Sequence, residues 1–371
     1  MIRSLRAVAA LTLAALLLGA CQSGVSRRSA PASTGALPVV DLQRRLEVFT
    51  TAEGVPGAVV GVWSPEGEWI HPAGVADIES GATMKPDDIF PIRSVTKSMT
   101  VTMIQQLVEE HELSLDDPIS MYVKGVPNGD EITLRQLAGM TSGLADYSQS
   151  PEFGKALTKD PDAPRTVREL LSFALDELPN FAPGARFEYS NTNTLLLGLV
   201  VERVTGDSYG DALEKRIFEP AGMTHTSYPA DGEVPDPHPV GYQLDDEGEP
   251  QPVTVNLTAL GPAGGVVSTV SDLGRYAKAL FDGTLISRGS LKERMAHGRQ
   301  PGPHDPEYDA YGLGLGELAG WWGHTGEGLG FEALVMHDLK TDRTVVILMN
   351  LTGTRNHVPT ELFRNYAFIL R

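Results

Sequence analysis

The chain has 371 residues, which is enough for one large domain or for two that share a core. Apolar residues make up 41% of it, a share that suits a globular protein and excludes a largely disordered one. The formal net charge of -18 argues against binding nucleic acid or anionic lipid through charge.

The first residues predict a processed leader. Residues 1–6 are basic, and the apolar run Ala7–Leu18 is too short for a typical membrane span. The run ends in Leu18-Gly19-Ala20-Cys21, which resembles the lipobox of bacterial lipoproteins, where cleavage precedes an acylated cysteine. We therefore predict a signal peptide over 1–20 and lipidation of Cys21, the only cysteine in the chain. An ordinary cleaved signal with an incidental Cys21 is the alternative.

The segment after the leader predicts a link to a membrane. Residues 21–36 are rich in Ser, Ala, Gly and Pro, which indicates a flexible tether. An exported protein with this anchor would sit on the cell membrane or outer membrane and face the periplasm or the exterior. A single cysteine allows no internal disulfide. The folded part is predicted to span 37–371.

Strands are predicted near the start of the folded part. A short amphipathic helix at Asp41–Ala52 comes first. The continuous apolar run Ala58–Trp63 predicts a buried strand, and Glu68–His71 and Gly74–Ala76 predict the next two strands.

A long helix is predicted from Ser94 onward, with apolar residues at helical spacing. Ser94 and Lys97 would project together, since Cβ atoms three residues apart on a helix are roughly 5–6 Å apart. Backbone N–H groups in a first turn favour nearby negative charge, which suits a nucleophile that generates an oxyanion. Alone the pair is a weak signal, because a serine three residues before a lysine is expected by chance about once in a chain of this length and composition. Ser94 as a simple N-cap is the alternative.

Helices are predicted through the middle of the chain. Thr194–Val204 is an apolar helix that ends at Gly206. Residues 146–162 are polar and rich in turn formers, which predicts a surface loop. Residues 231–252, rich in Pro, Gly and acid, predict an excursion that covers a site. The other predicted helices in this region span 132–140, 167–175 and 212–218.

The order of elements predicts the fold class. Near the C-terminus we expect a helix at 270–280, strands at 331–336 and 344–351, and a final helix at 360–370. Strands thus lie towards both ends and helices in the middle. The simplest arrangement is an α/β (α+β) fold, in which an antiparallel sheet from both terminal regions is flanked by helices. A mostly helical insertion over 106–251 would leave a cleft with Ser94 at its junction.

Two later stretches carry polar groups that suit a site. Tyr189 and Asn191 are two apart, and side chains two apart in an extended segment point the same way. His324-Thr325 is flanked by glycines, which let a ligand approach the backbone closely. Alternatively Tyr189 is a core tyrosine, Asn191 a turn former and His324 a structural histidine.

Taken together, these stretches resemble a known family. Ser94-Val95-Thr96-Lys97, Tyr189-Ser190-Asn191 and His324-Thr325-Gly326 resemble the S-x-x-K, Y-x-N and H/K-T-G motifs of the serine β-lactamase and penicillin-binding protein family. The similarity runs from about Leu37 to the C-terminus. It is strongest to secreted serine D-alanyl-D-alanine carboxypeptidases, since class C β-lactamases usually have lysine in place of His324. The resemblance implies the β-lactamase/transpeptidase-like fold.

The resemblance also implies a mechanism. Ser94 would attack a carbonyl and form an acyl-enzyme, with Lys97 or Tyr189 as the base. Both residue types ordinarily have pKa values near 10 or above, so one must be lowered. We expect a coupled pair and leave the base open.

Further residues are carried over from the family motifs. Asn191 is expected to orient Lys97 and the substrate amide. The backbone N–H groups of Ser94 and Glu327 are expected to form the oxyanion hole. His324, Thr325 and Gly326 are expected to line the strand edge that faces the substrate.

Two departures keep the substrate open. Gly316 stands where some of these carboxypeptidases carry arginine, and Glu327 replaces a small hydroxyl residue. Both weaken D-Ala-D-Ala cleavage and favour an esterase or another amidase. A carboxypeptidase or β-lactamase on peptide or β-lactam amides is thus predicted, with a carboxylesterase or a non-catalytic penicillin-binding-like protein as alternatives. No cofactor, metal, nucleic acid or obligate protein partner is predicted, since the histidines are scattered and no Walker-type loop occurs.

Overall fold

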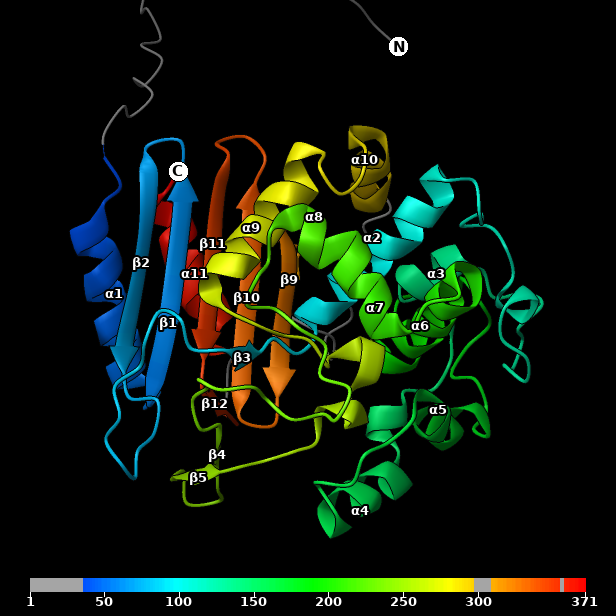
Figure 1. Cartoon of the computed structure of the whole chain (residues 1–371), viewed down its shortest axis with the longest axis horizontal. Helices are drawn as coiled ribbons and strands as arrows, with labels where there is room; N and C mark the ends of the chain where they lie inside the picture. The colour runs from blue at the N-terminus through cyan, green and yellow to red at the C-terminus, as the bar shows by residue number, and fades with distance from the viewer. Residues whose placement is uncertain (1–35, 297–307, 354–356) are drawn as a thin grey trace, which may run out of the picture. The chain divides into compact units, whose positions relative to one another are not determined.

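The computed structural model describes residues 36–296, 308–353 and 357–371 (Figure 1). They belong to one compact unit, Ala36–Arg371. The predicted signal peptide, the predicted lipidation of Cys21 and all but the last residue of the predicted tether lie outside the described residues.

A seven-stranded antiparallel sheet joins the two ends of this unit, as predicted. Its strand order is β2-β1-β11-β10-β9-β8-β7. The N-terminal β1 pairs with the C-terminal β11 in the register Ala58↔Met349, so that blue and red-orange strands adjoin in Figure 1. The strands are β1 (Gly57–Ser64), β2 (Gly67–Gly74), β7 (Ala310–Tyr311), β8 (Gly316–Leu318), β9 (Trp321–Gly328), β10 (Phe331–Asp338) and β11 (Arg343–Met349). One strand, β2, replaces the two that we predicted after β1.

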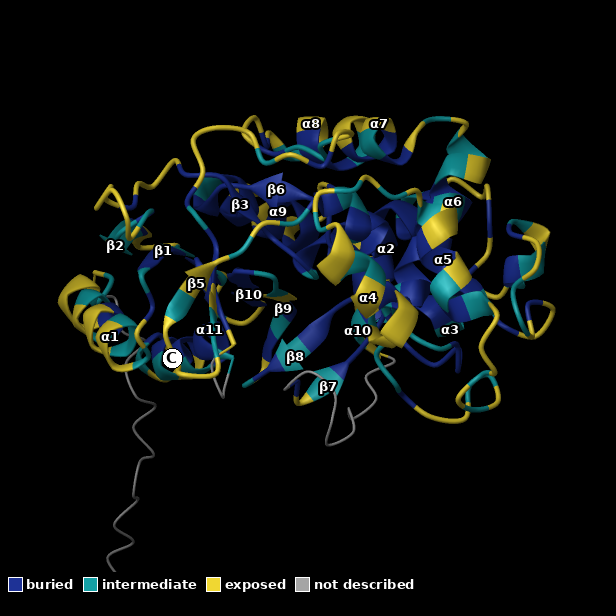
Figure 2. Cartoon of the chain, turned by 90° about the horizontal axis from the view of Figure 1, so that it is seen from below, coloured by how far each residue is buried: buried dark blue, intermediate teal, exposed yellow. Residues whose placement is uncertain are grey.

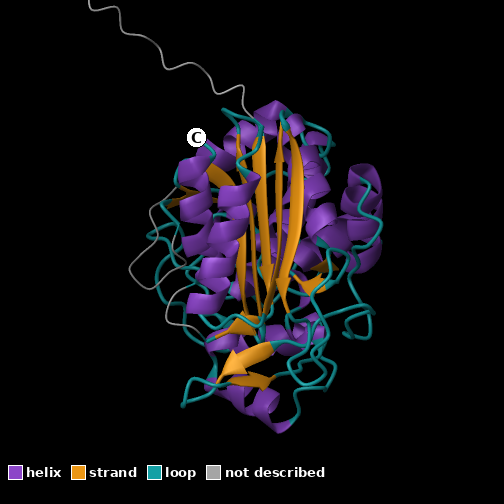
Figure 3. Ribbon diagram, turned by 90° about the vertical axis from the view of Figure 1, so that its left-hand side faces the viewer, coloured by secondary structure: helices purple, strands orange, loops and turns teal. Residues whose placement is uncertain are grey.

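Helices cover both faces of this sheet (Figure 3). Alternate side chains of β10 enter separate cores, as the pleat of a strand requires. Ala333 and Val335 pack on the side of α2 and α9, whereas Leu334 and Met336 pack on the side of α1 and α11. The helices are α1 (Val39–Ala52), α2 (Val95–Glu109), α9 (Val270–Asp282) and α11 (Val358–Ile369).

The chain between β2 and β7 is mostly helical. Short strands, β3 (Phe90–Pro91) with β6 (Val267–Ser268) and β4 (Tyr242–Leu244) with β5 (Pro250–Pro252) and β12 (Leu351–Thr352), complete the fold. The α-helices of this region are α3 (Leu134–Ala138), α4 (Pro151–Lys159), α5 (Val167–Leu175), α6 (Asn191–Thr205), α7 (Tyr209–Leu213), α8 (Glu219–Ala221) and α10 (Arg288–Ala296). A π-helix spans Glu214–Phe218, and 3-10 helices span Ile119–Met121, Tyr147–Gln149, Leu257–Ala259 and Gly261–Ala263.

Helix α2 is buried on nearly all sides through its first three turns (Figure 2). Its polar residues therefore need partners inside the protein. Thr100 Oγ1 is hydrogen-bonded to Tyr209 OH at 2.6 Å, and Arg294 Nη1 donates to Thr102 Oγ1 at 2.7 Å. The serine and lysine of the first turn are thus carried by the central helix of the molecule.

The prediction of a surface loop over 146–162 is wrong. Residues 147–149 form a 3-10 helix and Pro151–Lys159 forms α4. Pro151 starts α4 at a position where proline is tolerated, and Phe153 anchors it in an aromatic cluster with Tyr147 and Phe173. One buried aromatic thus holds a short polar helix against the core.

Across the described ranges, no helix has both the length and the apolar character that a membrane span needs.

Candidate active site

The start of α2 lies close against strand β9. Arg93, the residue before the helix, has a positive φ of 53°, a sparsely populated conformation for a side-chain-bearing residue. A Cβ on Gly326 of β9 would be 2.4 Å from Ile92 O and 2.9 Å from Ser94 N. Only glycine lets the strand approach so closely, and this approach sets the Ser94 backbone N–H beside β9.

Lys97 and Ser94 are directly hydrogen-bonded. Lys97 Nζ donates to Ser94 Oγ and to Ala263 O, each at 2.7 Å, and the lysine is fully buried. Burial lowers the pKa of Lys97 to about 7, although the charge of Asp146 acts to raise it. Ser94 stands at the N-cap position, but its side chain caps no backbone N–H. Its hydroxyl faces an amine that is partly neutral near pH 7.

Tyr189 completes this cluster from the helical region. Its hydroxyl is hydrogen-bonded to Ser94, and its ring centroid is 5.0 Å from Lys97 Nζ. Burial, together with Tyr311 and Tyr308, raises the pKa of the Tyr189 phenol well above its usual value. The pKa values of the two candidate bases therefore move apart, and the lysine amine is easier to deprotonate than the phenol.

Asn191 does not project from an extended segment as predicted. The chain is extended only through Ser190, and Asn191 is the first residue of α6. Its Nδ2 donates to Asp146 Oδ2 and to Ser148 Oγ, each at 2.9 Å. Within the described residues its amide makes no hydrogen bond to Lys97 but contacts Asp146, whose charge acts on that lysine.

Asp146 is a site residue that the sequence analysis missed. Burial raises its pKa, while hydrogen bonds from Ser148 and Asn191 and the charge of Lys97 oppose that shift. It lies in the segment that we assigned to a surface loop. Its place after the Thr141-Ser142-Gly143-Leu144 turn gave no signal of catalytic use.

His324 lies at the site but is enclosed. The residue is only 1% exposed, so its ring is closed off from solvent. Its Nε2 is 3.0 Å from Tyr311 OH and its Nδ1 is 3.1 Å from Tyr308 OH. Burial and the charge of Lys97 lower its pKa to about 3, which keeps the ring neutral. The ring centroids of His324 and Tyr189 are 6.4 Å apart, so the histidine lies beside the tyrosine that is hydrogen-bonded to Ser94.

Thr325 follows on the same strand. Its backbone N–H donates to Tyr308 OH at 2.7 Å, and its Oγ1 is 2.7 Å from the same hydroxyl. Tyr308 therefore covers this part of the β9 edge, a contact that the motif alone did not indicate.

The expected oxyanion donors lie on α2 and β9. In the described part of the chain, the Ser94 backbone N–H makes no hydrogen bond to another residue. Glu327 is exposed on β9, one residue past Gly326, and is paired across the ladder with Glu332 of β10. Among the described residues, no group of three His, Cys, Asp or Glu side chains is placed to hold a metal ion.

Comparison with known proteins identifies the family. The model of the family described as Beta-lactamase matches residues 42–365. The chain belongs to the beta-lactamase family. It is a serine hydrolase of the family's β-lactamase and penicillin-binding protein type.

Relatives in this family have more than one described activity. A putative penicillin-binding protein of Bacillus subtilis (strain 168) is 27% identical over 88% of this chain and 78% of its own length. A D-aminopeptidase of Brucella canis is 27% identical over 88% of this chain, which spans 63% of that protein's length.

Solved structures of family members have the same fold. A D-stereospecific amidohydrolase from Streptomyces sp. matches with a TM-score of 0.78 and 31% identity, over 88% of this chain and 98% of that one. The D-amino acid amidase from Ochrobactrum anthropi SV3, complexed with L-phenylalanine amide, matches with a TM-score of 0.79 and 26% identity, over 89% and 97%.

Proposed function

We propose that this serine hydrolase cleaves amide bonds through an acyl-enzyme on Ser94. The observation that carries the proposal is the 2.7 Å hydrogen bond from a fully buried Lys97 amine to Ser94 Oγ. A serine hydroxyl is a weak nucleophile until a base takes its proton.

Lys97 is the base in this proposal. Its pKa of about 7 leaves a substantial neutral fraction at physiological pH, whereas the phenol of Tyr189 stays protonated. As Ser94 Oγ bonds to the carbonyl carbon, its proton passes to Lys97 Nζ. Tyr189, hydrogen-bonded to Ser94, then gives its hydroxyl proton to the departing amine nitrogen as the C–N bond breaks, and the proton held on Lys97 Nζ restores the phenol. Water releases the acyl group by the reverse route.

The oxyanion is stabilised by backbone N–H groups. We assign the stabilisation of the oxyanion to the N–H groups of Ser94 and Glu327, on the two elements that Gly326 brings together. Each donor of this kind is worth about 2.7–4 kcal/mol in other serine hydrolases.

The relatives support a substrate class for this proposal. Two structural neighbours are named as hydrolases of D-amino acid amides or D-stereospecific amides, and a relative is a D-aminopeptidase. We therefore place amides of D-configured amino acids first. D-Ala-D-Ala peptides and β-lactams come next, because exposed Glu327 would repel a free C-terminal carboxylate. Simple esters remain the alternative on the same scaffold.

Covalent labelling tests the reaction type. Labelled penicillin or a fluorophosphonate should acylate the wild-type protein and not Ser94→Ala. Ser98→Ala, one turn along α2 with its hydroxyl bound to Tyr276, is the matched control and should still be labelled. If neither probe labels the wild type, the binding-protein alternative is favoured.

Steady-state rates separate the substrates. D-phenylalanine amide, a D-Ala-D-Ala peptide, nitrocefin and a short p-nitrophenyl ester should be compared, with Ser94→Ala as the blank. We expect the D-amino acid amide to give the highest kcat/KM. A preference of tenfold or more for the ester over every amide would reassign the protein as an esterase.

We also propose that the protein acts outside the cytoplasm on a lipid anchor. The basic residues 1–6, the apolar run and the lipobox-like Leu18–Cys21 support this.

A further inference from the structure

The group that protonates the leaving amine lies beside an open stretch of the β9 edge. Strand β8 pairs with β9 only from Trp321 to Gly323, so the described strands leave the next residues of β9 unpaired on this side. Tyr189 gives its proton to the departing amine in the proposed reaction, and its ring centroid is 6.4 Å from that of His324. A leaving group that reaches Tyr189 therefore has to lie along β9 near His324 and Thr325.

Tyr308 occupies that part of the edge. Its hydroxyl accepts a hydrogen bond from the Thr325 backbone N–H at 2.7 Å and lies 2.7 Å from Thr325 Oγ1. The same hydroxyl is 3.1 Å from His324 Nδ1. The N–H of Thr325 is on the open side of β9, where an extended substrate would bond to the strand. One phenol thus takes the backbone donor and the side-chain hydroxyl that a longer leaving group would meet.

The ring of Tyr308 fits over a glycine. A Cβ on Gly316 would lie 2.2 Å from both Cδ1 and Cε1 of Tyr308, so any other residue at this position would displace the ring. The ring also packs against Tyr311 and His324, with centroid distances of 5.5 Å and 5.7 Å. Tyr308 is only 6% exposed. Packing on several sides therefore fixes it over the strand edge.

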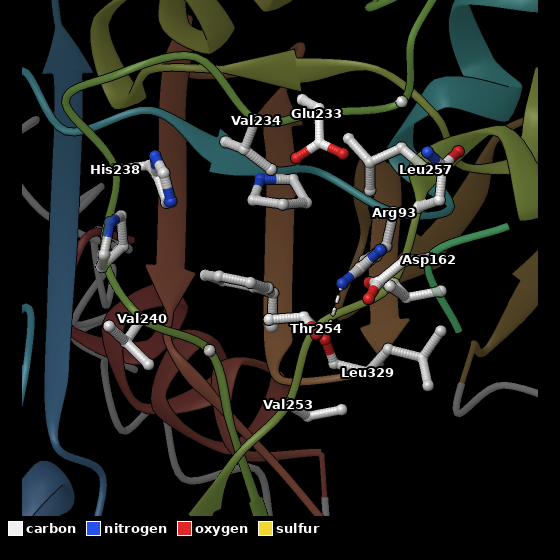
Figure 4. Close-up of a pocket in the computed structure, with 17 residues that line it drawn as sticks. Arg93, Asp162, Glu233, Val234, His238, Val240, Val253, Thr254, Leu257 and Leu329 are labelled. Carbon is white, nitrogen blue, oxygen red and sulfur yellow. Dashed lines mark hydrogen bonds between the residues drawn. The ribbon is translucent and has the colours of Figure 1, made fainter. Parts of the chain in front are cut away.

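The cavity in Figure 4 offers no other place for a long leaving group. It is lined by Arg93, by Leu329 of the β9–β10 turn and by residues between 232 and 257. Tyr189 and Thr325 do not line it. An amine in that cavity would not contact the phenol that is to protonate it.

We propose that Tyr308 is a specificity-determining residue that limits the leaving group to ammonia or a very small amine. The C–N bond that breaks then belongs to a primary amide or a short N-alkyl amide, and the released nitrogen takes the hydroxyl proton of Tyr189. A peptide, whose leaving amine extends further along β9, would have to displace the phenol from Thr325. The inference rests on the proposed acyl-enzyme at Ser94 and narrows its substrates to the simple amides of D-amino acids.

Four substrates with the same acyl group test the inference. D-phenylalanine amide, D-phenylalanine methylamide, D-phenylalanyl-D-alanine amide and D-phenylalanyl-D-alanine differ only in the leaving amine. The second and third are both secondary amides, so their ratio reports on the size of the amine. The last two differ in the terminal carboxylate. We expect kcat/KM for the methylamide to exceed that for the dipeptide amide by about tenfold or more, since a fitted pocket discriminates even single methylene groups about tenfold.

Substitutions at two positions separate the ring from the hydroxyl. Tyr308→Ala removes both and should raise kcat/KM on the dipeptide amide relative to the methylamide by about tenfold. Tyr308→Phe keeps the ring over Gly316 and should keep most of the preference. Gly316→Ala displaces the ring without changing it and should also relax the preference. Each ratio compares two substrates in one preparation, so partial unfolding of a variant does not alter it.

Tyr122→Ala is the matched control. This partly buried tyrosine follows the 3-10 helix Ile119–Met121, and its hydroxyl donates to Asp117 Oδ2 at 2.6 Å. The variant loses a tyrosine of similar size outside the site. It should change none of the ratios among the four substrates.

The inference and the proposed function fail in different ways. A wild type that cleaves the dipeptide amide as fast as the methylamide would show that Tyr308 does not select the leaving group, and so would a preference that survives Tyr308→Ala. Either result leaves the acyl-enzyme on Ser94 intact. If Tyr308→Ala yields no folded protein, the ratio in Gly316→Ala decides. If the wild type cleaves none of the four substrates, the proposed amide hydrolysis itself is overturned.

Discussion

Lys97 shows how one residue is tuned by its surroundings. Its amine bonds two neutral acceptors, Ser94 Oγ and Ala263 O, so no direct ion pair holds its proton. Asp146 acts on it by charge alone, while its own oxygens bond Ser148 and Asn191. Burial therefore outweighs the attraction, and the pKa settles near 7 instead of above 10. An ordinary surface lysine could not accept a proton at neutral pH.

The pH dependence of acylation should follow this amine. If neutral Lys97 is the base, as proposed, kcat/KM for amide hydrolysis should rise with pH, reach half its maximum near pH 7 and level off above it. Asp146→Asn removes the negative charge that raises the pKa of Lys97. Its half-maximum should therefore lie at a lower pH than that of the wild type, as measured by kcat/KM profiles from pH 4 to 9.

A control variant separates the effect of the charge beside Lys97 from the effect of removing a carboxylate elsewhere on the protein. Asp160→Asn changes an exposed carboxylate at the end of α4 and should leave the midpoint unchanged. A midpoint that moves upward in Asp146→Asn, in protein shown to be folded by circular dichroism, would contradict the assignment of Lys97 as the base.

At the scale of elements, the site depends on how closely β9 approaches α2. Gly323 and Gly326 leave no space for a side chain, since a Cβ on Gly323 would lie 1.8 Å from Val335 O. Thr325 and Glu327 flank Gly326 and point to the opposite face of β9, so at Gly326 the strand presents only its backbone to the start of α2. The glycines of the His-Thr-Gly stretch are thus a packing requirement as well as a motif.

Gly326→Ala should therefore impair both folding and reaction. Its Cβ would meet Ile92 O and Ser94 N, and overpacking of this kind costs about 1–3 kcal/mol of unfolding free energy. Because the strand must also shift from Ser94, kcat/KM should fall at least tenfold. Urea unfolding and steady-state rates measure the two effects. Gly154→Ala in α4, where a Cβ meets nothing within 4 Å, should be neutral or stabilising with full activity.

The elements differ in how well the sequence predicted them. Strong periodicity or an unbroken apolar run gave β1, α2, α5, α6 and β10 close to their observed bounds. The helix α4 was missed because its polar sequence is held by one aromatic contact, at Phe153, which no local pattern records. Asn191 was misplaced for a related reason, since the start of α6 overrides the extended segment before it.

Only those site residues that belong to a sequence motif could be predicted. Ser94 and Lys97 share a helical turn, so their spacing already implied the contact. Asp146 and Tyr308 reach the site from other elements, through tertiary packing that a single sequence does not encode locally. The enclosure of His324 also depends on two tyrosines brought in by the chain before β8.

At the scale of the whole molecule, the chain ends close the sheet and the middle supplies the catalytic partners. Strand β1 joins β11, while Tyr189 and Asp146 come from the helical region between β2 and β7. The nucleophile lies where these regions meet. Both must therefore be folded before the lysine amine is buried and its pKa lowered.

The remaining prediction concerns where the whole molecule resides. Cys21 is the only cysteine of the sequence and so can form no disulfide within the chain, and Cys21→Ser should leave the Tm and kcat/KM of the purified protein unchanged. In cells the same change should abolish incorporation of radiolabelled palmitate and move the protein from the membrane fraction to the soluble one. The acyl chains would anchor the protein because each CH₂ group buried in the membrane contributes about 0.8 kcal/mol of binding free energy. Persistent membrane fractionation of Cys21→Ser, or an unlabelled wild type, would show that the leader is an ordinary cleaved signal or an uncleaved one.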